Sequence, residues 1–225
     1  MLYVVATPIG NLDDFSMRAV STLRSVDFIF AEDTRVTRVL LEKYNIQKHI
    51  ISYHQHSDEK KIREIISLLT EGKDIALVTD AGTPGISDPG NHLISQILEE
   101  LPELKIIPIP GPSALISALS ISGFPTDKFV FLGFPPHKKG RQTFFKKIYE
   151  INETIAFYES KHRILKAMTE LDTLSQLGYR EIMVARELTK QFESVYRGTV
   201  QDVIKKLKSH EDNQLGEFVV VIRAK

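Results

Sequence analysis

Short apolar runs alternate with longer amphipathic segments through the first half of the chain. The apolar runs predict buried strands, and apolar residues that recur at helical spacing between them predict helices. Ile62, Ile65, Ile66 and Leu69 show this spacing just before Gly72, a residue typical of helix ends. The alternation predicts a mainly parallel sheet, whose strands we expect at residues 2–6, 28–31, 49–53, 75–78 and 105–109.

Two serines stand where helices are expected to begin. Ser16 and Ser57 each precede a helical apolar pattern, and serine is a favoured residue at the N-cap. In the first two helices, the spacing assigns inward positions to Met17, Val20 and Leu23, and to Val36, Val39 and Leu40.

The second half of the chain mixes strands and helices in a different order. Strands are expected near residues 128–133, 154–158, 181–186, 194–198 and 217–223, and helices near 113–121, 141–149, 162–171 and 199–207. Residues 181–186 and 194–198 are close enough along the chain to pair antiparallel. We therefore predict two α/β domains, residues 1–111 with a mainly parallel sheet and residues 112–225 with a mixed sheet.

Three loops rich in proline and glycine follow predicted strands, at residues 7–12, 80–90 and 110–114. The central loop begins at Asp80 and is longer than the roughly two to six residues of an ordinary connection between a strand and a helix. Ligands bind at the carboxyl ends of strands in open α/β sheets. We therefore favour a ligand pocket, made mostly of backbone, over plain connections.

Composition narrows the class of protein. At 42% hydrophobic and 26% charged residues, the chain is typical of soluble globular proteins. Its N-terminus lacks the pattern of a signal peptide and no apolar run is long enough to span a membrane, so we expect a cytoplasmic protein. The formal net charge is zero, so a nucleic acid would have to be bound by local basic patches.

Common motifs for metals, nucleotides and nucleophilic catalysis are missing from the sequence. The chain has no cysteine, which excludes disulfides and thiolate metal sites. His54 and His56 lie two residues apart without a third ligand, so we interpret them as polar surface residues and expect no metal. The glycine patterns of dinucleotide-binding and P-loop proteins and the G-x-S-x-G elbow are also absent.

Seven segments, taken in order over essentially the whole chain, resemble one family. It is the tetrapyrrole-methylase (class III) superfamily of S-adenosylmethionine-dependent methyltransferases, and in particular its bacterial members that 2′-O-methylate a cytidine ribose in the decoding region of 16S ribosomal RNA. The matching segments are 7–12 (TPIGNL), 31–35 (AEDTR), 80–90, 110–114 (PGPSA), 157–160 with His162 and Arg163, 186–190 (RELTK) and 216–219 (GEFV).

The resemblance implies two α/β domains that hold S-adenosylmethionine in the cleft between them, and a homodimer. The positions it implies as cofactor contacts are Ile9, Asp80, Gly82, Thr83, Ile86, Ser113, Ala114, Tyr158 and Leu188. For Ile86, Ala114 and Leu188, plain packing in the core is an equally good interpretation. Members of the family often carry a further small C-terminal domain.

Methylation of a ribose hydroxyl would be helped by a base that takes its proton. The candidates are Asp33, Glu187 and Lys190, the last only if its amine is neutral. Asp33 could instead form a simple ion pair with Arg35, and Lys190 could be a solvated cation or a phosphate contact.

Basic residues cluster in three places, at 60–63, at 137–141 with Lys146 and Lys147, and at 205–208. The first and last clusters are expected on solvated helix faces. The middle cluster begins in a Gly/Pro loop beside aromatic residues and is the best candidate for contact with RNA. We expect phosphate contacts from Arg35, Lys138, Lys139 and Arg141.

Two other functions remain open at this point. One is methylation of a corrin-type macrocycle by a small-molecule enzyme of the same superfamily, and the other is a binding protein that keeps the pocket without turnover. Segment 31–35 and the basic loop favour the substrate being the RNA of the small ribosomal subunit.

Overall fold

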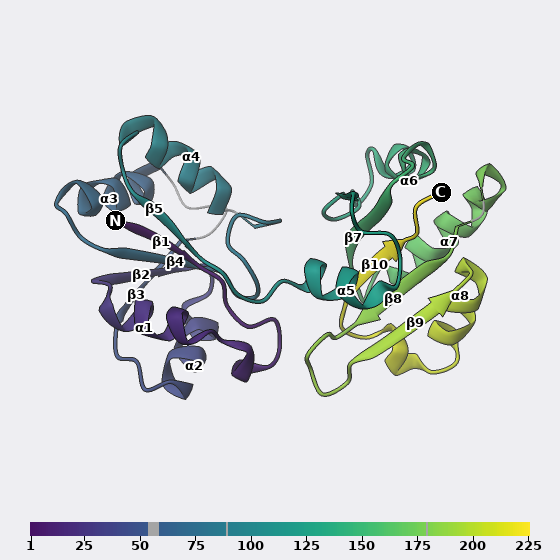
Figure 1. Ribbon diagram of the computed structural model, residues 1–225, viewed down its shortest axis with the longest axis horizontal. Helices are drawn as coiled ribbons and strands as arrows, with labels where there is room; N and C mark the ends of the chain where they lie inside the picture. Colours follow the sequence, from purple (N-terminus) through teal and green to yellow (C-terminus); the bar gives the residue numbers. More distant parts are fainter. Residues whose placement is uncertain (54–58, 89, 179) are drawn as a thin grey trace. The chain divides into compact units, whose positions relative to one another are not determined.

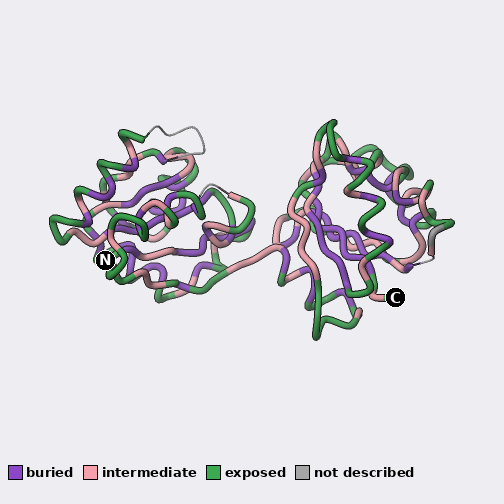
Figure 2. The backbone as a smooth tube through the Cα atoms, turned by 90° about the horizontal axis from the view of Figure 1, so that it is seen from above, coloured by how far each residue is buried: buried purple, intermediate pink, exposed green. Residues whose placement is uncertain are grey.

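A computed structural model describes residues 1–53, 59–88, 90–178 and 180–225 (Figure 1). The chain forms two compact units, Met1–Ser113 and Ala114–Lys225. Over the described residues, each unit contains one five-stranded sheet, and Figure 2 shows buried residues along the strands of both units. The domain boundary that we expected between residues 111 and 112 stays a prediction.

The N-terminal unit has a parallel sheet in the strand order β3-β2-β4-β1-β5, as the β-α alternation predicted. Its strands are β1 (Leu2–Val5), β2 (Phe28–Ala31), β3 (His49–Ser52), β4 (Ile75–Val78) and β5 (Ile106–Ile109). Its helices are η1 (Leu12–Asp14), α1 (Met17–Ser25), α2 (Thr34–Lys43), α3 (Glu59–Thr70) and α4 (Gly90–Glu100).

Alternate residues of each strand in this sheet point into two different cores. Ile29 and Ala76 pack with residues of α1 and α2, whereas Phe30 and Ile75 pack with residues of α3 and α4. Figure 1 shows the two pairs of helices on opposite sides of the sheet. Because both faces are covered, the loops that follow the strands at their carboxyl ends are left to form a site.

The C-terminal unit has a mixed sheet in the order β6-β7-β10-β8-β9, with only the β6–β7 pair parallel among the described strands. The predicted antiparallel pairing of the segments around 181–186 and 194–198 is confirmed by β8 and β9. The strands are β6 (Phe129–Phe131), β7 (Thr154–Ser160), β8 (Ile182–Arg186), β9 (Ser194–Gly198) and β10 (Glu217–Ile222). The helices are α5 (Ala114–Ser122), α6 (Arg141–Glu150), α7 (Ile164–Leu174), η2 (Ser175–Leu177), α8 (Val200–Lys208) and η3 (Glu211–Gln214).

Some local predictions are confirmed and others are wrong. Ser16 caps α1, because its Oγ accepts a hydrogen bond of 3.1 Å from the backbone N–H of Ala19. Met17 was expected in the core but is 83% exposed, since it occupies the first position of α1 on the outer side. The buried faces of α1 and α3 otherwise follow the prediction, with Val20, Leu23, Ile62, Ile65, Ile66 and Leu69 all buried.

The buried face of α2 differs from the prediction. Val36 and Val39 are exposed, and the core side of the helix is formed by Thr37, Leu40 and Leu41. A polar threonine thus occupies an inward position that the apolar pattern could not reveal. The expected cap Ser57 and the histidines His54 and His56 lie outside the described residues.

Candidate functional site

Three loops at the carboxyl ends of β1, β4 and β5 are joined to one another. The first and second are linked by two backbone hydrogen bonds, from Thr7 N to Gly82 O (2.9 Å) and from Gly82 N to Thr7 O (3.1 Å). The hydroxyl of the buried Thr7 also donates to Thr79 O at 2.9 Å. The second and third loops meet where the hydroxyl of Thr83 donates to Pro112 O at 3.4 Å. The structure therefore brings together the three Pro/Gly loops that the sequence singled out.

Gly82 lies at the centre of this junction in a conformation that favours glycine. Its φ is +86°, in the left-handed region that other L-residues rarely adopt. A Cβ at this position would lie 3.7 Å from Cγ2 of Ile9 and 3.8 Å from O of Pro112. Ile9 itself is buried. The loops approach each other through backbone and small atoms, as expected for a pocket made mostly of main chain.

Asp80 begins the central loop, and its side chain is held by the segment that follows the neighbouring strand β2. One of its carboxylate oxygens accepts a hydrogen bond of 2.9 Å from the backbone N–H of Asp33. Although Asp80 is exposed as a residue, partial desolvation of its carboxylate raises its pKa; the hydrogen bond from Asp33 opposes this rise, and the charge of Glu32 adds to it. The site thus carries a positioned carboxylate that can accept hydrogen bonds from hydroxyl groups.

Asp33 has a structural task that the sequence analysis missed. It is the N-cap of α2, where its Oδ1 accepts a hydrogen bond of 2.8 Å from Arg35 N, and its Oδ2 lies 2.6 Å from Nη2 of Arg35. The side-chain and backbone hydrogen bonds from Arg35 lower the pKa of Asp33 to about 2. A carboxylate so engaged is a weak base. The Asp33–Arg35 ion pair offered as the alternative is present, and an aspartate just before a helix pattern is the signal that could have revealed the cap.

The distal part of the central loop is held by a carboxylate that sequence reasoning also missed. Oδ1 of Asp88 accepts hydrogen bonds of 2.7 Å from the backbone N–H groups of both Gly85 and Gly90. The side chain of Ile86, between them, is 51% exposed. Core packing therefore does not explain Ile86, which stays a predicted cofactor contact.

In the C-terminal unit, the segment after β8 has an unusual backbone. Glu187 and Thr189 both have positive φ, 50° and 67°, on either side of the buried Leu188. Glu187 Oε1 accepts a hydrogen bond of 2.8 Å from Glu217 N. A Cβ on the neighbouring Gly216 would lie only 2.5 Å from Cδ of Glu187. Strained backbone of this kind is often found at functional sites, although the burial of Leu188 leaves core packing open for that residue.

Lys190 lies between two carboxylates. Its Nζ is 3.0 Å from Oε1 of Glu187 and 2.8 Å from Oε2 of Glu217. Burial alone would lower the pKa of Lys190, but the hydrogen bonds to Glu217 and Glu187 outweigh it, so the pKa is raised. The pKa of Glu187 is lowered, because hydrogen bonds from Glu217 N and Lys190 outweigh the effect of burial. Lys190 is therefore an ammonium at neutral pH, and the neutral amine that a lysine base requires is not favoured.

Tyr158 and Ala114 lie in one region of the C-terminal unit. The ring of Tyr158 is 4.9 Å from that of Phe131 and 5.4 Å from that of Phe134. Burial raises the pKa of its hydroxyl, and a hydrogen bond with the backbone of Leu115 opposes the rise. Leu115 follows Ala114 at the start of α5, so Tyr158 lies beside the beginning of that helix. Ser113 and Ala114 are both half-buried.

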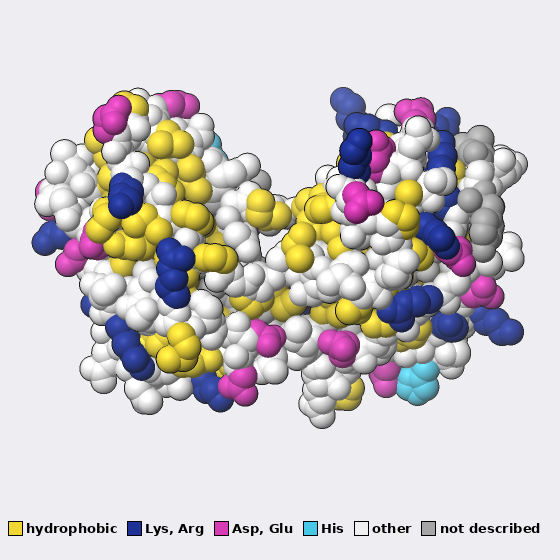
Figure 3. All heavy atoms as spheres, viewed as in Figure 1, with side chains coloured by type: hydrophobic (Ala, Val, Ile, Leu, Met, Phe, Trp, Pro, Cys, Tyr) yellow, Lys and Arg dark blue, Asp and Glu magenta, His cyan; other side chains and the backbone are white. Residues whose placement is uncertain are grey.

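The predicted RNA contacts divide into two kinds. Lys138 and Lys139 are exposed, as is the side chain of Arg35. Arg141, which was also predicted to contact phosphate, is only 4% exposed. Its Nε is 2.8 Å from Oε2 of Glu170. Figure 3 shows lysine and arginine side chains spread over the visible face of the C-terminal unit, with acidic side chains among them.

The described residues contain neither a metal-binding cluster nor a membrane-spanning helix. No group of three or more histidine, cysteine or acidic side chains placed to hold a metal ion occurs among them. Within the same residues, no helix is both long and apolar enough to cross a membrane.

The chain combines two α/β units, one with a parallel and one with a mixed sheet, and Pro/Gly loops are joined at the strand ends of the first unit. Residues 1–204 match the family model described as Tetrapyrrole (Corrin/Porphyrin) Methylases. The chain therefore belongs to this family, which confirms the resemblance found in its motifs. Among solved structures, the methyltransferase CobJ is similar with a TM-score of 0.71, at 19% sequence identity over 99% of this chain and 93% of that one. At such low identity, the likeness shows the fold alone.

Relatives at much higher identity point to one branch of the family. A Thermotoga maritima protein named ribosomal RNA small subunit methyltransferase I is 46% identical, over 100% of this chain and 98% of the relative. A Synechocystis protein of the same name is 48% identical over 99% of this chain and 78% of its own length. One from Escherichia coli O157:H7 is 42% identical over 98% of this chain and 77% of its own length.

Proposed function

We propose that this protein uses S-adenosylmethionine to methylate the ribose 2′-oxygen of a cytidine in the decoding region of 16S ribosomal RNA. The observation that carries the proposal is the full-length identity of 46% to a protein named ribosomal RNA small subunit methyltransferase I. We also propose the small ribosomal subunit as substrate, a cytoplasmic location and a homodimer.

The loops of the N-terminal unit fit the cofactor. A bound S-adenosylmethionine supplies an activated methyl group on its sulfonium sulfur. Gly82 and Thr83 would border it through backbone and a small side chain, and Ile9 would give an apolar contact beside them. Asp80 is held in place by the N–H of Asp33, and its carboxylate would accept hydrogen bonds from the hydroxyl groups of the cofactor. The other predicted contacts are Ile86, Ser113, Ala114, Tyr158 and Leu188.

Methylation of a ribose hydroxyl replaces its O–H bond with an O–CH₃ bond, so a proton must leave. Asp33 is poorly suited to take it, since it is a helix cap with a pKa of about 2. Glu187 has a lowered pKa and Lys190 is already protonated. We therefore infer that Lys190 acts through its positive charge, on the ribose or on the phosphate next to it.

Lys190→Ala should lower the rate of methylation about tenfold or more, with little change in cofactor affinity, because the charge would act on the reacting nucleotide. Lys190→Arg, which keeps the charge, should retain more of the rate. Burial lowers the pKa of Lys190, but hydrogen bonds to Glu217 and Glu187 outweigh it and raise the pKa above that of a free lysine. The rate of the wild-type enzyme should therefore not rise from deprotonation of Lys190 below about pH 9. Single-turnover rates and calorimetry would test both points. A rate that climbs between about pH 8 and 9, and loses this climb in Lys190→Ala, would show a neutral amine base instead.

The decisive assay for the function is methylation of small ribosomal subunits that lack the modification. Product nucleosides resolved by mass spectrometry should contain 2′-O-methylcytidine. Arg35, Lys138 and Lys139 would make phosphate contacts in this complex, and Arg141 would support them from below the surface. A methyl group found only on a base would contradict the ribose assignment. Transfer to a corrin-type macrocycle, but not to RNA, would favour the alternative function.

A further inference from the structure

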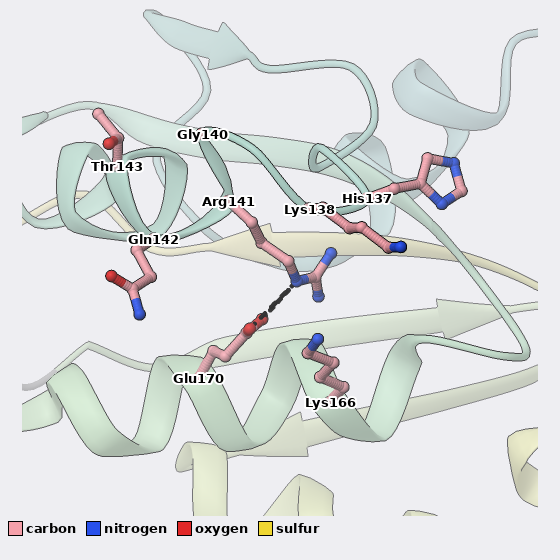
Figure 4. A pocket seen from close by; sticks show the side chains of 8 residues that line it. All are labelled: His137, Lys138, Gly140, Arg141, Gln142, Thr143, Lys166 and Glu170. Carbon is pink, nitrogen blue, oxygen red and sulfur yellow. Dashed lines mark hydrogen bonds and ion pairs between the residues drawn. The ribbon is translucent and has the colours of Figure 1, made fainter.

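A hollow of about 360 Å³ opens at the start of α6, and its lining includes none of the residues predicted to contact the cofactor. Its lining comes from the loop before α6, from the first turn of α6 and from α7 (Figure 4). The residues that matter here are Lys138, Arg141, Gln142, Thr143, Lys166 and Glu170. The lining includes no aliphatic side chain and no phenylalanine or tyrosine, so the hollow suits a charged group and not a base or another apolar ring.

Positive charge gathers in this hollow. Figure 4 shows the side chains of Lys138 and Lys166 approaching the guanidinium of Arg141 from the loop and from α7. Within the part of the chain that the structure describes, neither lysine has an ion-pair partner, and Glu170 is already paired with Arg141. Cations held near one another repel, and a bound anion would relieve this repulsion.

The first turn of α6 adds uncharged donors. Its N-cap is Gly140, which has no side chain to accept a hydrogen bond. The N–H of Arg141 donates to Lys138 O at 3.3 Å. The next two N–H groups, of Gln142 and Thr143, have no acceptor among the described residues. Free N–H groups at a helix start favour an anion, most of all a phosphate.

Arg141 provides the independent sign of a ligand. Only 4% of it is exposed, yet its Nη2 has no hydrogen-bond partner among the described residues. The other nitrogens are fixed, Nε by Glu170 at 2.8 Å and Nη1 by Pro136 O at 3.2 Å, and the buried carboxylate of Glu159 lies 3.5 Å from Nη1. Buried polar nitrogens rarely remain unpaired in proteins. The guanidinium is thus a rigid, positively charged base of the hollow, with one buried N–H group unpaired.

We propose that this hollow binds a phosphate of the RNA backbone, as a subsite separate from the site of methyl transfer. Lys138 and Lys166 make the charged contacts, the first turn of α6 gives N–H donors, and Arg141 forms the base. Because the lining contacts a phosphate and not a base, the contact does not depend on the RNA sequence, and it positions the RNA on the protein. This inference rests on the proposed function, since it takes ribosomal RNA as the substrate.

The test compares two double variants of the full chain. Lys138→Ala with Lys166→Ala removes both lysines of the hollow, whereas Lys205→Ala with Lys208→Ala removes the same charge from exposed positions on α8. Binding to small ribosomal subunits is measured over a salt series, and cofactor affinity by calorimetry. The first variant should bind about tenfold more weakly at ~0.15 M salt, with a salt slope about one unit smaller than that of the control. Cofactor affinity should be unchanged in both.

Three results separate the possible outcomes. Equal RNA affinities and salt slopes for the two double variants would overturn the subsite, even if the wild type methylates RNA normally. Tight binding of inorganic phosphate to the wild type, lost in Lys138→Ala with Lys166→Ala while RNA affinity matches the control, would assign the hollow to a small anion and also overturn it. Weaker RNA binding by the first variant, with a wild type that binds but does not methylate RNA, would support the subsite and contradict the proposed function.

Discussion

Gly82→Val should weaken the binding of S-adenosylmethionine by about a hundredfold or more, which corresponds to about 2.7 kcal/mol. Valine has a branched Cβ, and the φ of +86° at this position is unfavourable for it. Its Cβ would lie 3.7 Å from Ile9, and its two further carbons would extend into the junction of the three loops. Calorimetry with the folded variant measures the effect directly.

Gly72→Val is the matched control for this experiment. Gly72 also has a positive φ, +81°, at the end of α3, but a Cβ there would have nothing within 4 Å. Both variants carry a similar backbone strain of about 1–2 kcal/mol, so both should lose stability. Only Gly82→Val should lose the cofactor. Unchanged affinity in a folded Gly82→Val protein would remove Gly82 from the cofactor site.

The regular elements were predictable because their burial is periodic. Ile62, Ile65, Ile66 and Leu69 form one helix stripe that is visible in the sequence and buried in the structure. The strand before Asp80 is an apolar run, and all four of its residues are buried. Loops that follow parallel strands must lie at one edge of the sheet, so the meeting of the Pro/Gly loops also followed from the order of elements.

The state of the charged residues could not be derived in the same way. Arg141 stands in a run of basic residues that looks solvated, yet its partner Glu170 is 29 positions further along the chain. Of the two carboxylates around Lys190, Glu187 is three positions away in the sequence, but Glu217 is 27 positions away. Protonation and burial of such groups depend on contacts that only the tertiary structure brings together. One local feature of the sequence did indicate a buried charge, namely Glu159 within the apolar strand β7.

Glu159→Gln should lower the free energy of unfolding of the C-terminal unit by about 3 kcal/mol. The side chain of Glu159 is fully buried between two arginines, with Oε1 2.9 Å from Nε of Arg163 and Oε2 3.5 Å from Nη1 of Arg141. Glutamine keeps nearly the same volume but removes the negative charge. Arg163 would lose its ion-pair partner, and Arg141 would keep only Glu170. An uncompensated buried charge is among the most destabilising changes that a single substitution can make.

Glu181→Gln makes the same chemical change at an exposed ion pair of the same unit. Its partner is Arg223, and their side chains are 43% and 50% exposed. Exposed pairs contribute at most about 1 kcal/mol, so this variant should be nearly as stable as the wild type. Because the chain forms two compact units, hydrogen exchange of the amides in β7 and β10 is the measurement that reports on the C-terminal unit itself. Equal protection of these amides in the two variants would mean that the charge of Glu159 does not hold Arg141 and Arg163 in place. The rigid base inferred for the phosphate subsite would then lose one of its supports.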